Sequence, residues 1–138
     1  MKRHRSLSMR GKASASKLEK HADGLIQELA HTARVCANCG GTWKLGGHHV
    51  VHKPACRGSR YGLRHDPSNI ILLCGRCHTP WAHEREEDFL EWLRTHRPKQ
   101  YAWREEQLAT PLITSECSRT VEYLKEVIAR LTGLISSF

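Results

Sequence analysis

The sequence predicts a small α+β fold in which a metal-stapled middle segment lies between helices. Apolar residues recur at helical spacing near both ends of the chain, whereas the middle has glycine-rich turns and short apolar runs. Two Cys-x-x-Cys pairs bracket that middle segment. The chain has 138 residues, about one domain, which excludes a large barrel or a doubly wound sheet. A core of this size gains stability from a metal or a disulfide staple.

The charge of the chain is strongly positive and concentrated near its start. Lysine and arginine number 22 against 14 aspartates and glutamates, a net charge of +8. Residues 1–20 hold seven of the basic residues and one glutamate, so they carry +6 of this charge. The balance favours a polyanionic partner, with nucleic acid ahead of acidic substrates. We expect residues 1–15 to form a flexible basic arm that orders on phosphate; a solubilising tail is the alternative.

Hydropathy argues against a membrane protein. The longest apolar runs cover only a few residues, as in 70–74, far short of the roughly 20 that cross a bilayer. No apolar segment follows the basic start, so residues 1–20 do not resemble a secretory signal. We therefore expect no membrane partner and a cytoplasmic protein, in the host cytoplasm if a phage encodes it.

Helical periodicity defines the two flanks of the chain. A stripe of apolar residues predicts an amphipathic helix over 16–33, before a core that we place at 34–98. Within that core, 50–51 and 70–73 are predicted as short strands joined by an irregular loop, and a helix follows the last cysteine pair. A C-terminal helical extension, 99–138, carries an apolar seam that either packs onto the chain's own core or joins two copies in a homodimer. The seam residues are Val121, Leu124, Ile128, Leu131 and Ile135.

Four of the six cysteines form two Cys-x-x-Cys pairs separated by 34 residues. Four soft thiolates suit tetrahedral Zn²⁺ in a closed site with no position left for water. The sequence therefore predicts a structural zinc that clamps the two ends of the intervening segment. A redox role is the alternative, although two such pairs in one small chain more often share an ion. The four expected zinc ligands are Cys36, Cys39, Cys74 and Cys77.

Histidines and one asparagine lie between and beside these cysteine pairs. The pair His48-His49 comes first, then Asn69, and His78 directly follows the last cysteine. In this order and spacing, residues 34–83 resemble the HNH endonucleases of the ββα-metal fold, in their four-cysteine zinc-containing form. The resemblance implies a DNA endonuclease built on a ββα-metal core.

The resemblance also implies a role for each of these side chains. His49 would be the general base that activates a water, and Asn69 would orient it and tie down the loop. His48 and His78 would bind the catalytic divalent cation, Mg²⁺ or another such as Mn²⁺, Ni²⁺ or Zn²⁺. Some members of the family add a third histidine ligand, for which His83 is the candidate. An offset of five residues turns His83 about 140° away from His78 on a regular helix, so an irregular turn would be needed.

The chemistry fits these residue types independently of the family. A phosphodiester is negatively charged and repels hydroxide, so its hydrolysis needs a cation at the scissile phosphate and a free base for the water. Neighbouring side chains of a strand point to opposite faces, so His48 can face the cation while His49 faces the water. The amide of Asn69 can accept from a ring N–H or from the backbone, and so fix which nitrogen of His49 stays basic.

Basic residues flank this constellation, chiefly in the loop between the predicted strands. We expect them to hold the phosphate backbone of the cut strand, which makes the affinity for DNA fall with salt. His52 and His65 also lie in this loop, where we expect them to be solvated rather than catalytic. The five candidate nucleic-acid contacts are Lys53, Arg57, Arg60, Arg64 and Arg76.

These observations together predict a metal-dependent DNA endonuclease that makes nicks or double-strand breaks. The main alternative is a catalytically silent, zinc-stabilised nucleic-acid-binding module, and a third is an assembly factor that works through its C-terminal seam. The stretch Arg64–Asn69, with two helices after the last cysteine pair, resembles the NinG-type phage recombination endonucleases. That likeness implies phage recombination or DNA processing, with branched DNA ahead of simple restriction.

Overall fold

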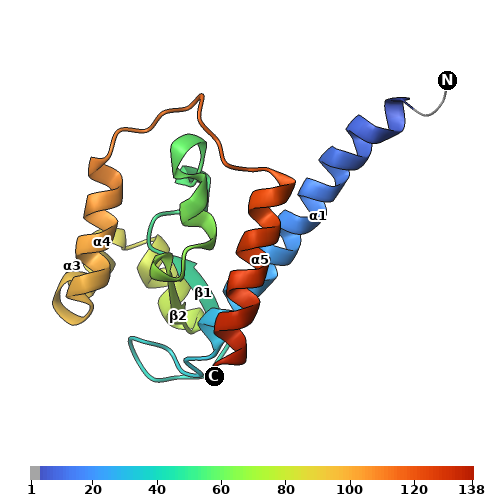
Figure 1. Ribbon diagram of the computed structural model, residues 1–138. Helices are drawn as coiled ribbons and strands as arrows, with labels where there is room; N and C mark the ends of the chain where they lie inside the picture. Colours follow the sequence, from blue (N-terminus) through green and yellow to red (C-terminus); the bar gives the residue numbers. More distant parts are fainter. Residues whose placement is uncertain (1–3) are drawn as a thin grey trace.

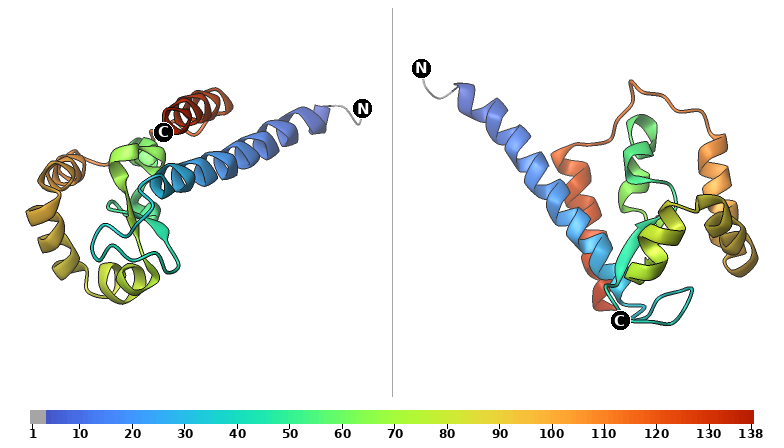
Figure 2. Two further views of the ribbon diagram at one scale, coloured as in Figure 1. Left: turned by 90° about the horizontal axis from the view of Figure 1, so that it is seen from below. Right: turned by 180° about the vertical axis from the view of Figure 1, so that it is seen from behind.

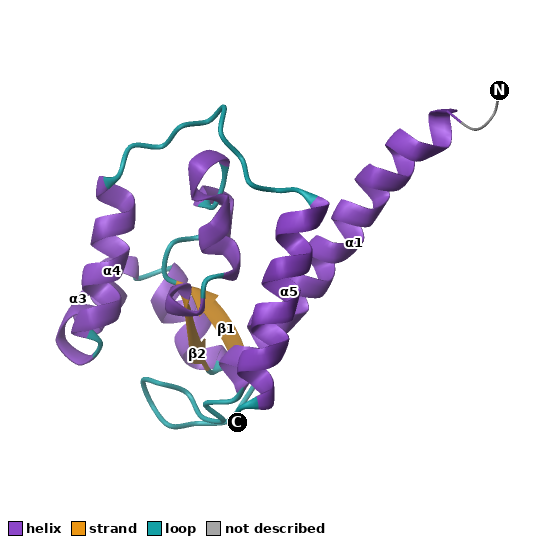
Figure 3. Cartoon of the chain, viewed as in Figure 1, coloured by secondary structure: helices purple, strands orange, loops and turns teal. Residues whose placement is uncertain are grey.

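A computed structural model of the chain describes residues 4–138. Two antiparallel strands occupy the middle, short helical turns fill the connection between them, and longer helices lie on either side (Figures 1 and 3). The α+β fold predicted from the sequence is confirmed. The longer helices are α1 (His4–His31), α3 (Glu86–His96), α4 (Pro98–Ala109) and α5 (Val121–Ser136), and the strands are β1 (Gly46–His49) and β2 (Ile70–Leu73).

Short helical elements carry much of the middle of the chain. Three 3₁₀ turns occupy the connection between the strands, where the sequence predicts an irregular loop. After β2, one short α-helical turn leads directly into a π-helical turn. These elements are η1 (Lys53–Ala55), η2 (Gly58–His65), η3 (Pro67–Asn69), α2 (Gly75–Cys77) and η4 (His78–His83).

The two strands form an antiparallel sheet that pairs Gly46 with Leu73 and His49 with Ile70. The strand predicted at 50–51 is wrong in its position, because the strand is β1 and residues 50–51 form a bend just after it. The Val50 N–H still donates to the Asn69 carbonyl at 3.0 Å, one residue beyond β1. Apolar side chains from this hairpin pack against η4 and α3 in one buried core. Its buried members are Cys36, Val50, Ile71, Leu73, Cys74, Cys77, Ala82, Phe89 and Leu93.

A second apolar core forms where α5 lies against α1 (Figures 1 and 2). Leu124 and Leu131 of the predicted seam are fully buried there, opposite Ala22 and Ile26 of α1. The seam therefore packs onto the chain itself, which is one of the two alternatives the sequence left open. A homodimer through the C-terminal helix stays a prediction. No helix within residues 4–138 is long and apolar enough to cross a bilayer.

The start of the chain differs from the predicted flexible arm. The backbone of α1 is helical from His4, well before the predicted start at residue 16, and its first turns project away from the rest of the chain (Figure 1). This stretch contains no proline, so nothing interrupts a helix that propagates outward from its packed part. Residues 1–3 of the predicted arm lie outside the described residues. The core limits at 34 and 98 fall close to the ends of α1 and α3 and stay predictions.

Polar side chains of α1 hold the edge of β1 that faces away from β2. The Gly47 N–H donates to Oε1 of Gln27 at 2.8 Å, and Nε2 of Gln27 donates to the Gly47 carbonyl at 3.1 Å. One turn further along α1, Nε2 of His31 lies 3.2 Å from the Leu45 carbonyl. Because residues four apart share one face of a helix, α1 docks on β1 through a polar stripe beside its apolar one.

Replacing Gly47 by alanine should destabilise the protein. The added Cβ would lie 2.8 Å from Oε1 of Gln27 and 3.0 Å from Ile70, so Gln27 would lose its place on β1. Overpacking of this kind costs about 1–3 kcal/mol, which a lower midpoint of thermal or urea unfolding measures. Gly24→Ala on α1 is the matched control, because nothing lies within 4 Å of its added Cβ. Equal midpoints for the two variants would contradict the docking of α1 on β1.

Candidate metal centres and active site

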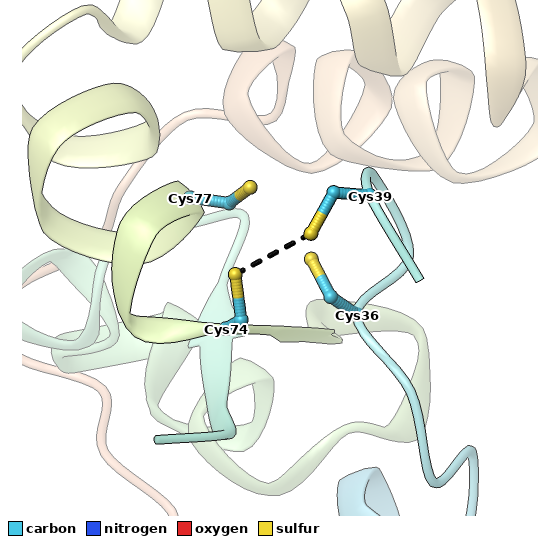
Figure 4. Close-up of side chains that lie close together, drawn as sticks. All are labelled: Cys36, Cys39, Cys74 and Cys77. Carbon is cyan, nitrogen blue, oxygen red and sulfur yellow. Dashed lines mark hydrogen bonds between the residues drawn. The ribbon is translucent and has the colours of Figure 1, made fainter. Parts of the chain in front are cut away.

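The four predicted zinc cysteines come together at one end of the hairpin. Cys36 and Cys39 lie in the loop after α1, while Cys74 and Cys77 flank the turn after β2. Their sulfur atoms point toward one another and all lie within 4.8 Å (Figure 4). The Sγ atoms of Cys39 and Cys74 are 3.5 Å apart. A tetrahedral ion with Zn–S bonds of about 2.3 Å separates its ligands by about 3.8 Å, so the cluster fits a zinc ion.

Backbone and side-chain donors surround these sulfurs. Nδ2 of Asn38 lies 3.3 Å from Sγ of Cys77, and the Gly41 N–H donates to Sγ of Cys39. Burial alone would raise the pKa of Cys36, but backbone N–H groups of the cluster lower that pKa to about 7. At Cys77, burial and the neighbouring sulfurs raise the pKa to about 12. Since crowded thiolates repel one another, a divalent cation is what allows all four to be deprotonated together.

Three histidines form a second cluster. His48 projects from β1, and His78 and His83 stand at the two ends of η4. Their ligand nitrogens lie within 4.8 Å of one another. The ring centroid of His48 is 5.1 Å from that of His78 and 4.7 Å from that of His83. Both ring nitrogens of His48 are buried and have no hydrogen-bond partner, which is the state expected of a metal ligand rather than of a core histidine.

The π-helical turn of η4 explains why His83 joins this cluster. Its characteristic bond runs from the Glu84 N–H to the Thr79 carbonyl, five residues back, at 3.1 Å. Pro80 lacks the N–H that an α-helix would need at this point and its ring crowds the preceding turn. The wider turn places residues five apart on one face, and the ring centroids of His78 and His83 are 4.8 Å apart. The turn is therefore the irregular one that a third ligand would require.

The surroundings of His48 favour its neutral, metal-binding form. The edge of Phe89 packs against its ring, with centroids 5.0 Å apart. Burial, together with the charges of His83 and His78, lowers the pKa of His48 to about 3. Burial also lowers the pKa of His78. Because only the neutral imidazole can donate its lone pair to a metal, these side chains are held in the form that binds one.

His49 lies beside this cluster but has a different partner. Its Nε2 lies 2.9 Å from the carbonyl oxygen of Arg64. A carbonyl can only accept, so Nε2 carries the proton and Nδ1 is left as the basic nitrogen. Burial lowers the pKa of His49, and the bond to Arg64 partly offsets it. Both His48 and His49 line one pocket of about 330 Å³, together with Gly47, His52, Lys53, Pro54, His78 and His83.

Asn69 holds the backbone and does not contact the ring of His49. Its Oδ1 accepts from the Val51 N–H at 2.6 Å, and its Nδ2 donates to the carbonyls of Val51 at 3.1 Å and Leu63 at 2.9 Å. The expected tying down of the loop is thus visible. The expected direct orientation of the ring is not, since the Arg64 carbonyl takes that place. Asn69 acts one step away, because it fixes the residue before Arg64.

Two of the five predicted phosphate contacts are engaged inside the protein. The Arg64 guanidinium makes two hydrogen bonds to Asp23, and Arg60 donates to the carbonyls of Leu108 and Thr110. The Arg64 charge is paired with Asp23, whereas Arg60 bonds to neutral carbonyls and keeps its charge, with its Nε buried and unpartnered. Phosphate contacts by these two arginines stay a prediction. Arg57, Arg76 and Lys53 stay exposed, and Lys53 lines the pocket beside His49.

Sequence reasoning also missed residues around the pocket. His52 was expected to be solvated, but it lines the pocket and its Nε2 lies 3.5 Å from Glu86. His65 was expected to be solvated too, yet it is fully buried and bonded to Asp23. The spacing of Asp23 four residues before Gln27 on the predicted helix is the signal that could have pointed to a second, polar face of α1.

Comparison with known proteins bears on this core. Residues 36–84 match the family model of the HNH endonuclease. The match takes in both cysteine pairs, the histidine pair of β1, Asn69 and both histidines of η4. It covers 49 of the 138 residues and leaves out α1, α3, α4 and α5. Searches of curated proteins and of solved structures found no match.

The HNH match indicates a nuclease-type function for this core, and HNH nucleases act on DNA. It agrees with the sequence resemblance in family and in extent. The likeness to NinG-type recombination endonucleases is not tested by these comparisons and stays a prediction.

We expect the purified protein to retain one zinc ion per chain through mild chelation. Cys77→Ser should lose that zinc and unfold at a lower temperature, because the binding energy of a structural zinc is also folding energy. Elemental analysis and thermal unfolding measure the two effects. Cys117→Ser is the matched control, since Cys117 is exposed and outside the cluster. Full zinc content and an unchanged Tm in the Cys77→Ser protein would rule out the clamp.

Proposed function

We propose that the protein is a metal-dependent endonuclease that hydrolyses phosphodiester bonds in DNA. One observation carries the proposal: a buried His48 with two unpartnered ring nitrogens faces His78 and His83 in the pocket that also holds His49. A module that only binds nucleic acid has no use for three clustered imidazoles beside a fourth one held in a single tautomer. The HNH match over residues 36–84 supports the same assignment.

His49 is the general base in this proposal. Its Nε2–H is anchored on the Arg64 carbonyl, so the proton of the attacking water goes to Nδ1. The anchoring bond also favours the charged ring that forms when Nδ1 takes this proton, because the carbonyl dipole faces the N–H. The ring then needs no reorientation during the reaction, which is how a fixed hydrogen-bond partner aids a general base.

His48, His78 and His83 are the residues that would hold the catalytic cation. When bound, it would supply positive charge to neutralise the scissile phosphate and the leaving oxygen. Imidazole ligands suit transition metals, whereas Mg²⁺ prefers oxygen ligands. Of the cations expected from the sequence, the cluster therefore favours Ni²⁺ or Zn²⁺ over Mg²⁺.

The phosphate backbone of DNA would meet the exposed cations around the pocket. Lys53 lines the pocket, and Arg57 and Arg76 are exposed to solvent. Contacts of this kind supply affinity without reading bases, and they weaken as salt rises. Branched DNA, a place in phage recombination and a cytoplasmic location are further proposals that follow from the NinG-type likeness and the sequence.

Cleavage of supercoiled plasmid tests the base assignment. In the presence of Mn²⁺ or Ni²⁺, the wild-type protein should nick or linearise the plasmid, and His49→Ala should lower the rate by about 10²–10⁴-fold because general-base catalysis contributes that much. His21→Ala is the control, since His21 is exposed on α1 and outside the pocket. Equal rates for the wild type and His49→Ala would refute His49 as the base.

Binding of added metal tests the histidine cluster separately from the zinc clamp. Titration of zinc-loaded protein with Co²⁺, followed by its visible absorption, should show a second site. His83→Ala should weaken that site by at least about tenfold, since even outer-shell changes cost this much at a metal centre. The zinc content should stay unchanged. Unaltered Co²⁺ affinity in His83→Ala, matching His21→Ala, would remove His83 from the ligand set.

A further inference from the structure

One carboxylate of α1 reaches the peptide that anchors His49. Asp23 accepts two hydrogen bonds from the Arg64 guanidinium, at 2.9 and 2.7 Å, and lies 2.8 Å from Nε2 of His65. Arg64 and His65 are neighbours in the chain, so a single carboxylate holds the side chains on both sides of one peptide bond. The carbonyl of that peptide belongs to Arg64, and it is the acceptor for Nε2 of His49 at 2.9 Å.

The hydrogen bonds from Arg64 and His65 to Asp23 are strong and largely shielded from solvent. The side chains of Asp23 and Arg64 are 24% and 20% exposed, and that of His65 is fully buried. Forked, charge-assisted bonds of this kind are about twice as strong as neutral ones and also fix geometry. Burial alone would raise the pKa of Asp23, but hydrogen bonds from Arg64 and His65 and the charges of Arg64 and Lys53 hold it well below its usual range.

On the α1 side, the Arg64 guanidinium also has a longer contact, of 3.6 Å, with Glu19. Arg64 and His65 end η2, a short 3₁₀ segment, and such segments are less firmly held than α-helices. Asn69 fixes the preceding carbonyl, that of Leu63. The orientation of the Arg64 carbonyl is therefore set from two sides, by Asn69 within the HNH core and by Asp23 from a helix outside the matched residues 36–84.

We propose that Asp23 is a positioning residue of the active site, which fixes the Arg64–His65 peptide so that His49 keeps its proton on Nε2 and its basic nitrogen free. The inference rests on the proposed nuclease function. In this proposal α1 belongs to the active site, because it contributes Asp23, which lies outside the matched residues 36–84. Lys53, whose Nζ lies 3.5 Å from Asp23, is held at the pocket by the same group.

A spectroscopic test reads the tautomer of His49 without any cleavage. In zinc-loaded protein with ¹⁵N-labelled histidine, the two ring nitrogens of neutral His49 resonate far apart according to which one carries the proton. The wild type should show the Nε2–H form alone. Asp23→Asn, which keeps the size of the side chain but loses the charge, should show a mixture of the two forms. Glu28→Gln, on an exposed position of the same helix, should leave the spectrum unchanged.

Plasmid cleavage with Mn²⁺ provides the second arm. Asp23→Asn should lower kcat by about 10–100-fold, the usual effect of losing a group that orients a catalytic side chain, with KM for DNA unchanged. Arg64→Gln keeps the carbonyl but loses the fork, so it should have the same effect. The double variant should lose no more than the worse single one, because both act through one linkage. Zinc content and Tm confirm that each variant is folded.

Three results would overturn the inference: a wild-type tautomer and kcat in Asp23→Asn, a change in KM alone, or additive losses in the double variant. If Asp23→Asn does not fold, Arg64→Gln decides between the same outcomes. Failure of the proposed function looks different. A wild type that cleaves no DNA with any cation ends the nuclease proposal, while the tautomer arm still shows whether Asp23 positions His49.

Discussion

The convergence of four cysteine sulfurs is the constraint on which the rest of the core depends. It joins the loop after α1 to the turn after β2, and so closes the hairpin at one end. The Ala37 N–H also donates to the Leu72 carbonyl at 2.9 Å, which brings the first cysteine pair alongside β2. Because Cys77 directly precedes His78, the clamp fixes where η4 begins. The two candidate metal centres therefore adjoin each other at the start of η4.

The proposed active site extends beyond the stretch that matches the HNH family model. Polar residues at intervals of four along α1 face the core: Asp23 anchors Arg64, Gln27 holds Gly47 and His31 approaches Leu45. These contacts fix the backbone immediately before His48 and the carbonyl that binds His49. The apolar face of the same helix packs on α5. The helix α1 therefore packs against α5 through its apolar face and holds the backbone around His48 and His49 through its polar face.

How far the sequence could predict this arrangement depends on how local each feature is. The four-cysteine cluster follows from the spacing of the two pairs, whereas the approach of His48 and His78 is what the HNH resemblance implies. The inclusion of His83 could not follow from regular helix geometry, since it needs the π-helical turn at Pro80. The group that accepts from Nε2 of His49 is a backbone carbonyl. Every residue has a backbone carbonyl, so the amino-acid sequence does not indicate which one binds His49.

Hydrogen bonds between residues distant in the chain account for the remaining differences between the sequence predictions and the structure. Arg60 and Arg64 look like phosphate ligands in the sequence, but residues distant in the chain take up their donors. The pairing of Arg64 with Asp23 therefore reduces the net positive charge that this loop presents to DNA. Lys53 lines the pocket, and Arg57 and Arg76 are exposed to solvent.

The most direct measurement of the central claim is the X-ray absorption spectrum at the nickel edge of zinc-loaded protein to which Ni²⁺ has been added. If His48, His78 and His83 hold the second cation, the nickel signal must contain imidazole ligands and no sulfur. Sulfur around the nickel, or a spectrum with water ligands alone, would contradict the account.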